Sequence, residues 1–187
     1  MAAAKASALN NMQNMVSTTR ECKARRVPTG ETKIIPKGEF VTITQDLGGN
    51  YTVTWQGNML RIDGTDADAL GRKAQTLDFA EADNDEINQD QVWQALESVF
   101  DPEIPINLVS LGLIYDVDID QAKKQVNIKM TLTAPACGMG PVLVGDVEYR
   151  VAMVPNVEKV DVELVFDPPW SRDMMSEEAQ LEAGLFF

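Results

Sequence analysis

The stretch "TLTAPACGMGP", residues 131–141, marks the change from a strand pattern to a helix pattern and decides how the second half of the chain folds. Before it, apolar residues alternate with polar ones, a period typical of a strand with one buried face, at Val126, Ile128, Met130 and Leu132. After it, apolar residues recur with helical spacing at Leu143, Val147 and Val151. Asp146 and Arg150, four residues apart, are expected as a pair on the other face of this helix. The stretch therefore predicts a strand, a loop carrying Cys137, and a helix.

Two more helices are expected in this half of the chain. The first begins after Asn88, a favourable N-cap residue, with Gln91 at the reciprocal capping position, and ends at Pro102. The second is a short helix near the end of the chain, with Ser176 as its cap.

Three strands complete the domain, which we place at residues 87–187. Residues 113–119 alternate like residues 126–132, so the two segments predict an antiparallel hairpin joined through "DQAKKQ". A third alternating run follows at residues 160–166. The order helix, strand, strand, helix, strand, helix predicts a two-layer α+β domain with its helices on one face of a small sheet.

The first half of the chain has a different pattern of residues, typical of short strands and turns. Short strand patterns separated by glycine and asparagine turns predict a small all-β, barrel-like domain over residues 27–71. Its core is expected to contain Phe40, Val41, Ile43, Tyr51, Val53, Trp55, Leu60 and Ile62. Residues 1–26 lack periodicity and are interpreted as a mobile N-terminal arm, and residues 72–86 as an acidic linker.

Composition limits the classes of function. The chain has 187 residues, 44% of them hydrophobic, and a formal net charge of −13, which disfavours nucleic acid and anionic membrane surfaces as partners. We find no apolar run of about 18 residues and no secretory signal, so we expect a cytoplasmic protein. In that compartment Cys22 and Cys137 are expected to stay reduced rather than form a disulfide.

The position of Cys137 just before a helix has chemical consequences. Unpaired amide groups and the dipole at a helix start favour a thiolate, so the pKa of Cys137 is expected to fall. Gly138 and Gly140 leave the sulfur unshielded. The alternative from spacing alone is a buried cysteine that acts as a small hydrophobic residue.

Three motifs, taken in their order and spacing, resemble those of a known protein family: "DPEIPINLVSLGLIYDVDI", "MTLTAPACGMGP" and "FDPPWSRDMMSEEAQLEAGLF". Together they resemble the iron–sulfur cluster assembly (FSCA-like) domain family over about residues 84–187, and the β-rich segment before them is similar to that of its SufT group. The resemblance implies a role in the maturation of iron–sulfur proteins. The family cysteine maps onto Cys137 and the acidic residue of its "DPE" motif onto Asp101. Many relatives have proline after the cysteine, where this chain has Gly138.

The candidate binding residues are Cys137, as the metal ligand, with Asp101 and Thr133. The hydroxyls of Thr131 and Thr133 are placed to bond a thiolate, although threonine is also an ordinary strand residue. One cysteine cannot supply the four ligands of a cluster, so we expect a transient iron–sulfur cluster shared between chains. The other ligands would come from a second copy in a homodimer, from small thiols, from an apo client protein or from Cys22, whose basic neighbours would lower its pKa. The expected partners are SUF assembly proteins and apo iron–sulfur clients.

Other functions stay open beside this non-enzymatic role. A thiol-dependent enzyme would use Cys137 as nucleophile, but the chain has no histidine and no C-x-x-C pair to support it. A pure protein-interaction module would use the cysteine structurally. The chain has no phosphate-binding loop, which excludes the ATPase-fused relatives. The aromatic-acid degradation (PaaD) branch of the family remains an alternative, and the β-rich N-terminal segment favours the SufT group over it.

Overall fold

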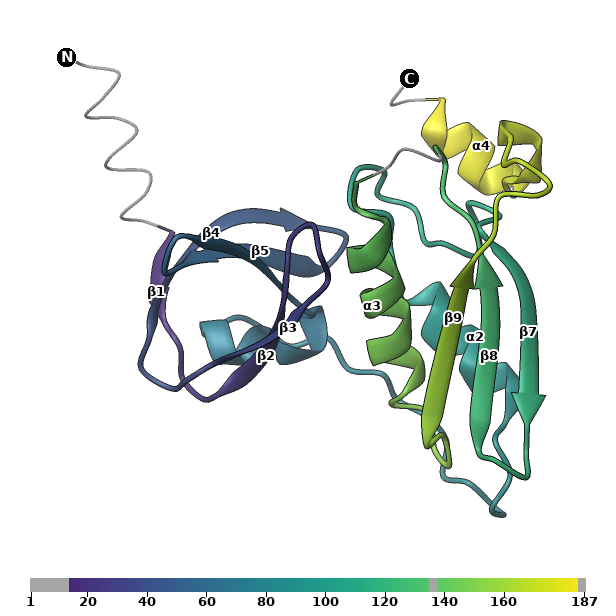
Figure 1. The fold of residues 1–187 in the computed structure, drawn as a ribbon, viewed down its shortest axis with the longest axis horizontal. Coiled ribbons are helices and arrows are strands. Elements are labelled where there is room, and N and C mark those ends of the chain that lie inside the picture. Colours follow the sequence, from purple (N-terminus) through teal and green to yellow (C-terminus); the bar gives the residue numbers. More distant parts are fainter. Residues whose placement is uncertain (1–13, 135–137, 185–187) are drawn as a thin grey trace. The chain divides into compact units, whose positions relative to one another are not determined.

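The computed structural model describes residues 14–134 and 138–184. Its chain divides into two compact units, Met1–Thr76 and Leu77–Phe187, whose boundary lies inside the predicted 72–86 linker (Figure 1). The protein is mixed α+β, as predicted. Each unit has its own hydrophobic core.

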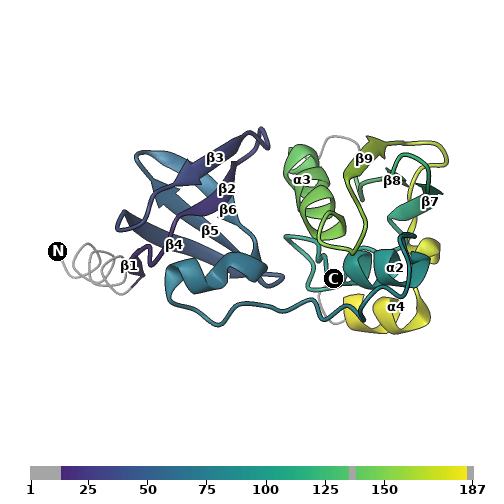
Figure 2. The same ribbon diagram turned by 90° about the horizontal axis from the view of Figure 1, so that it is seen from below.

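The second unit is built from a three-stranded sheet and helices. Its elements in chain order are α2 (Gln89–Glu97), β7 (Ile114–Asp120), β8 (Gln125–Met130), α3 (Gly140–Val151), β9 (Lys159–Leu164), the 3-10 helix η2 (Arg172–Met174) and α4 (Glu177–Ala183). The sheet order is β7-β8-β9, with β7 antiparallel and β9 parallel to β8. Figures 1 and 2 together show α2 on one face of this sheet, behind it in the first view and below it in the second. Apolar residues of the strands form one core with those of α2 and α3, while the charged residues between them are exposed.

The cap of α2 confirms one local prediction and corrects another. The Asn88 side chain accepts hydrogen bonds from the amides of Asp90 at 2.8 Å and Gln91 at 3.4 Å, as an N-cap residue should. The reciprocal bond predicted for Gln91, in which its side-chain oxygen would accept from the Asn88 amide, is not formed, and its Nε2 instead donates to the carbonyl of Ala80 at 2.8 Å. The helix also ends at Glu97, before the predicted stop at Pro102, with the turn closed at Ser98.

The face of α3 on which the Asp146 and Arg150 pair was predicted is buried as well. Asp146 is 0% exposed and Arg150 is 1% exposed. The reason is the packing of α3 on the end of α2, where Nη1 of Arg150 donates to the Ser98 hydroxyl at 3.3 Å and lies 3.5 Å from the Ser98 carbonyl. Spacing within one helix does not reveal which neighbouring helix will cover it.

Hydrogen bonds join the segment after β9, residues 165–176, to the segment just before β7, residues 110–112. The Trp170 indole donates to the carbonyl of Leu111 at 2.7 Å, and the Ser176 amide donates to that of Ser110 at 2.9 Å. Gly112, at a φ of 72°, fits only as glycine, because an added Cβ would lie 2.2 Å from the carbonyl oxygen of Met174. These contacts anchor the approach to α4 on the core.

The first unit is a six-stranded sheet with one 3-10 helix. Its elements are β1 (Met15–Ser17), β2 (Cys22–Arg26), β3 (Thr32–Ile35), β4 (Phe40–Leu47), β5 (Asn50–Trp55), β6 (Asn58–Ile62) and η1 (Gly64–Leu70). The strands pair in the order β1-β4-β5-β6-β2-β3. Closure into a barrel-like shape stays a prediction. Phe40 is 69% exposed and was wrongly expected in the core: side chains alternate along β4, and its neighbour Val41 faces inward.

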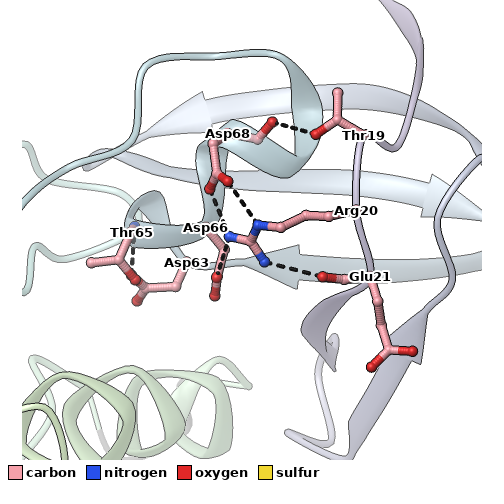
Figure 3. Close-up of polar contacts among 7 residues, drawn as sticks. All are labelled: Thr19, Arg20, Glu21, Asp63, Thr65, Asp66 and Asp68. Carbon is pink, nitrogen blue, oxygen red and sulfur yellow. Dashed lines mark hydrogen bonds and ion pairs between the residues drawn. The ribbon is translucent and has the colours of Figure 1, made fainter.

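The prediction of a mobile arm is wrong for residues 14–26, whereas residues 1–13 lie outside the described part of the chain. β2 pairs with both β3 and β6, and Cys22 is 3% exposed. Figure 3 shows how Arg20 fastens this segment to η1: Nε donates to Asp68 at 2.7 Å and Nη2 to Asp66 at 2.8 Å. Both aspartates are more than 40 residues away from Arg20 in the sequence, so no local pattern predicts these bonds.

Candidate functional site

The candidate site is the junction between β8 and α3. Directly after β8, the Thr131 amide donates to the carbonyl of Leu113 at 2.8 Å. Leu132 is buried, Thr133 is half-buried and Ala134 is exposed. Residues 135–137, among them the predicted ligand Cys137, lie outside the described residues.

Both ends of this loop are nevertheless fixed. The first residue of α3, Gly140, lies directly against Leu132, since a Cβ on Gly140 would come 3.0 Å from Cδ1 of Leu132 and 3.6 Å from Cδ1 of Leu164. Leu132 lies two residues beyond β8, and Leu164 is the last residue of the adjacent strand β9. Just beyond these ends, the Val165 amide donates to the Met130 carbonyl at 2.8 Å. The loop that carries Cys137 therefore leaves and re-enters the domain at one point.

The start of α3 has the electrostatics of a site for an anion. Its N-cap residue, Met139, makes no side-chain cap hydrogen bond, and its first turn contains no acidic residue. Pro141 lies at the first positions, where its missing N–H is tolerated. The partial positive charge of the helix start is therefore not offset by a capping side chain, and a thiolate beside it would be stabilised.

Thr131 is the polar residue at this junction that sequence reasoning undervalued. It is 0% exposed, and its hydroxyl has no hydrogen-bond partner among the described residues. A buried hydroxyl left without a partner costs about 1–3 kcal/mol. The threonine pattern in "TLTAP" drew attention to this residue, but its burial depends on tertiary packing.

Asp101 organises the loop after α2. Its Oδ1 accepts hydrogen bonds from the amides of Glu103 at 2.8 Å and Ile104 at 3.0 Å, and its own amide donates to the Ile106 carbonyl at 3.1 Å. The side chain is 8% exposed. Asp101 thus has a clear structural role, and its predicted role in binding a cofactor stays a prediction.

Two backbone hydrogen bonds link the Asp101 loop to the junction. The Leu108 amide donates to the carbonyl of Val99 at 2.9 Å, and the Leu113 amide donates to that of Leu108 at 3.0 Å. Leu113 then accepts from Thr131, as described above. The loop after α2 and the exit of β8 are therefore joined by consecutive backbone hydrogen bonds.

Cys22 does not have the chemistry that its basic neighbours predicted. Burial raises the pKa of the Cys22 thiol to about 11, and the carboxylate of Asp66 acts in the same direction. The predicted lowering of this pKa is therefore wrong. The described residues contain no group of three or more His, Cys, Asp or Glu side chains that could hold a metal ion.

These features define an α+β domain in which the segment that carries Cys137 follows the exit of β8 and precedes a helix without a side-chain cap. The sequence profile of the family described as "Iron-sulfur cluster assembly protein" matches residues 89–164, which include Asp101, Thr133 and Cys137. The chain is 46% identical over 96 residues to the "Fe-S protein maturation auxiliary factor" of Porphyromonas gingivalis, a match that covers 51% of this chain and 90% of that protein. This protein belongs to the iron–sulfur cluster assembly protein family.

Two further relatives carry related names. "Fe-S protein maturation auxiliary factor YitW" of Bacillus subtilis is 40% identical, over 54% of this chain and 98% of that protein. "Fe-S protein maturation auxiliary factor SufT" of Staphylococcus aureus is 39% identical, over 46% of this chain and 98% of that protein. Almost the whole length of each relative is matched by about half of this chain, so the β-rich N-terminal unit is additional to what the relatives share. None of the helices in residues 14–134 and 138–184 is both long and apolar enough to cross a membrane.

Proposed function

We propose that this protein is a maturation factor for iron–sulfur proteins that holds its cargo transiently through Cys137. Membership of the iron–sulfur cluster assembly protein family supports this role, as do three relatives named as maturation auxiliary factors. We place the activity in the cytoplasm, in line with the acidic composition, with SUF assembly proteins as donors and apo iron–sulfur proteins as clients. Its action is binding and handover rather than catalysis.

The observation that carries the proposal is the uncapped start of α3 directly after Cys137. An anionic sulfur at this position gains the helix-start interaction that no described side chain provides. The iron–sulfur unit is cargo here, and a thiolate is the ligand type that such units require.

Ligand counting argues for transient binding. A cluster needs about four protein ligands, and Cys137 supplies one. Cys22 is a poor second ligand, because its thiol is buried in the core of the first unit and its pKa is raised. The remaining ligands must come from small thiols, from a client or from a second copy of the chain. Such incomplete ligation suits handover.

An adaptor that docks clients without touching iron is the second candidate. It is favoured by one observation: the buried carboxylate of Asp101 bonds backbone amides of its own loop, which gives it a structural task. In that case the motif residues would shape a protein-binding surface instead of a metal site.

Anaerobic reconstitution with iron and sulfide tests these alternatives. Wild type, Cys137→Ser and the control Cys22→Ala are compared by visible absorption and by iron counted per chain. We expect substoichiometric, chelator-labile iron on wild type and on Cys22→Ala, and several-fold less on Cys137→Ser. Equal iron on Cys137→Ser would reject the carrier role, and a stable, iron-free Cys137→Ser that still matures clients would establish the adaptor.

A further inference from the structure

A hollow of about 380 Å³ lies at the hairpin of β4 and β5 in the first unit, and the proposed function does not use it. All of its lining residues belong to Met1–Thr76. The lining includes the polar side chains of Gln45, Asp46, Tyr51, Arg72 and Lys73. A hollow of this size suits a small molecule.

The hollow forms where the pairing of β4 with β5 is irregular. Ile43 pairs with Val53 and Gln45 pairs with Thr52, so Thr44 has no partner residue in the register. Such a bulge bends the strand and redirects its side chains, and bulges are frequent beside functional sites. All three of these β4 residues line the hollow, and the Thr44 hydroxyl donates to the Thr52 carbonyl at 3.1 Å.

The segment that supplies Arg72 and Lys73 is held on the first unit by backbone hydrogen bonds at both ends. The Arg72 amide donates to the Ala67 carbonyl at 3.0 Å, directly after η1. The Gln75 amide donates to the Gly64 carbonyl at 2.8 Å. These bonds keep the backbone of both cationic residues beside the hollow before a ligand arrives, which lowers the ordering cost of binding.

Arg72 and Lys73 are exposed, and neither forms an ion pair with another residue in the described part of the chain. In contrast, Arg20, Arg26 and Lys33 of the same unit each lie within 3.1 Å of a carboxylate oxygen. The formal net charge of the whole chain is −13, so its overall field repels anions. Two adjacent cations at one hollow are a local exception that attracts an oxyanion.

We propose that this hollow binds a small molecule that carries a phosphate or carboxylate group together with a hydroxyl or amino group. The Arg72 guanidinium and the Lys73 ammonium bind the oxyanion, because both are charged hydrogen-bond donors. The Tyr51 hydroxyl and the Gln45 side-chain amide add neutral donors. Asp46 is the one carboxylate among the described lining residues, and it accepts from the hydroxyl or amino group of the ligand.

Titration of the isotope-labelled full-length protein tests the site with inorganic phosphate, glycerol 3-phosphate and L-malate at constant ionic strength. We expect saturable NMR shifts of the amides of residues 44–46 and 72–73 with at least one organic probe. Tighter binding of glycerol 3-phosphate would identify a phosphate ligand, and tighter binding of L-malate a carboxylate ligand. The proposal would be overturned by no saturable shift at these residues, or by inorganic phosphate that binds as tightly as the organic probes.

Two double variants with the same change in net charge separate a built site from general charge attraction. Arg72→Gln with Lys73→Gln is expected to weaken binding of the tighter organic probe by at least about tenfold. Lys23→Gln with Lys37→Gln removes two exposed cations that do not line the hollow, and is expected to leave the affinity within about twofold.

Equal affinities of the two double variants for the probe would overturn the proposal, because general charge attraction would then account for the binding. All four substituted side chains are exposed, so both double variants are expected to keep the thermal unfolding midpoint of wild type. The titrations contain no iron and the hollow is lined by the first unit alone, so their outcome does not depend on the carrier function of Cys137.

Discussion

Leu132, two residues beyond β8, lies against Gly140 at the start of α3, so closely that a Cβ on Gly140 would come 3.0 Å from the Leu132 Cδ1 atom. The contact holds the exit of β8 against the first residue of α3, so the described flanks of residues 135–137 lie together.

Gly112, the neighbour of the Leu113 that bonds Thr131, gives the first stability prediction. Gly112→Ala should lower the free energy of unfolding by more than about 3 kcal/mol, because the left-handed φ costs about 1–2 kcal/mol and the added Cβ collides with the Met174 carbonyl. Gly71→Ala is the matched control: its φ is 68°, with nothing within 4 Å of the added Cβ, so only the backbone cost of about 1–2 kcal/mol applies. Urea unfolding measures both, and equal losses would contradict the collision.

Asp101 allows its structural and functional roles to be separated. Asp101→Ala should cost about 1–2 kcal/mol, because the amides of Glu103 and Ile104 lose their acceptor. Asp101→Asn keeps an oxygen acceptor and should lose less than half of that. Client maturation by the stable Asp101→Asn variant then decides: normal maturation means a structural role alone, and impaired maturation means that the charge is required.

The two cysteines should differ in reactivity and in their effect on pH stability. Because burial raises the pKa of Cys22 to about 11, Cys22 should resist alkylation near neutral pH while Cys137 reacts. The unfolded chain releases the Cys22 proton near its ordinary pKa of about 9 and the folded chain retains it, so stability should fall as pH rises from about 9 to 11. Cys22→Ala should lack this alkaline loss, and alkylation of native Cys22 at the rate of Cys137 would contradict the argument.

Arg20 gives a prediction for the segment that sequence reasoning misjudged. Arg20→Gln should destabilise the first unit by about 0.5–1.5 kcal/mol, a modest value because Arg20 and Asp68 are partly exposed. The bond from Arg20 lowers the pKa of Asp68, so its contribution is present above the ordinary aspartate pKa and is lost as pH falls through the lowered one. Unfolding of wild type and variant should therefore converge in acid and in high salt, and a difference that persists there would point to packing instead.

The residues that could be predicted from sequence are those whose partners are close along the chain. Asn88 and Ser176 cap their helices as expected, because a cap bonds amides two or three residues away. The interpretation of a mobile arm failed at Arg20, because its partners Asp66 and Asp68 lie in a distant segment. The same limit applies to the site: the helix start after Cys137 could be predicted from local signals, but the buried, unpaired hydroxyl of Thr131 depends on packing from strands and helices.

The boundary of the second unit gives the last prediction. A fragment of residues 77–187 should unfold cooperatively by itself, since it contains a complete core and since relatives matched by about half of this chain exist as separate proteins. A fragment that starts at residue 82 should be about 2 kcal/mol less stable. It lacks Phe79, which packs on the core, and the carbonyls of Asp78 and Ala80, which accept from Gln94 at 3.1 Å and Gln91 at 2.8 Å.

Chemical denaturation of the two fragments, with Phe79→Ala in the longer one as control, checks this boundary. Phe79→Ala should account for most of the difference, because burial of an aromatic ring contributes more than two partly exposed hydrogen bonds. Equal free energies of unfolding for the two fragments would mean that residues 77–81 add nothing to the stability of the second unit. A longer fragment that fails to unfold cooperatively would mean that the core of the second unit needs the first unit to be complete.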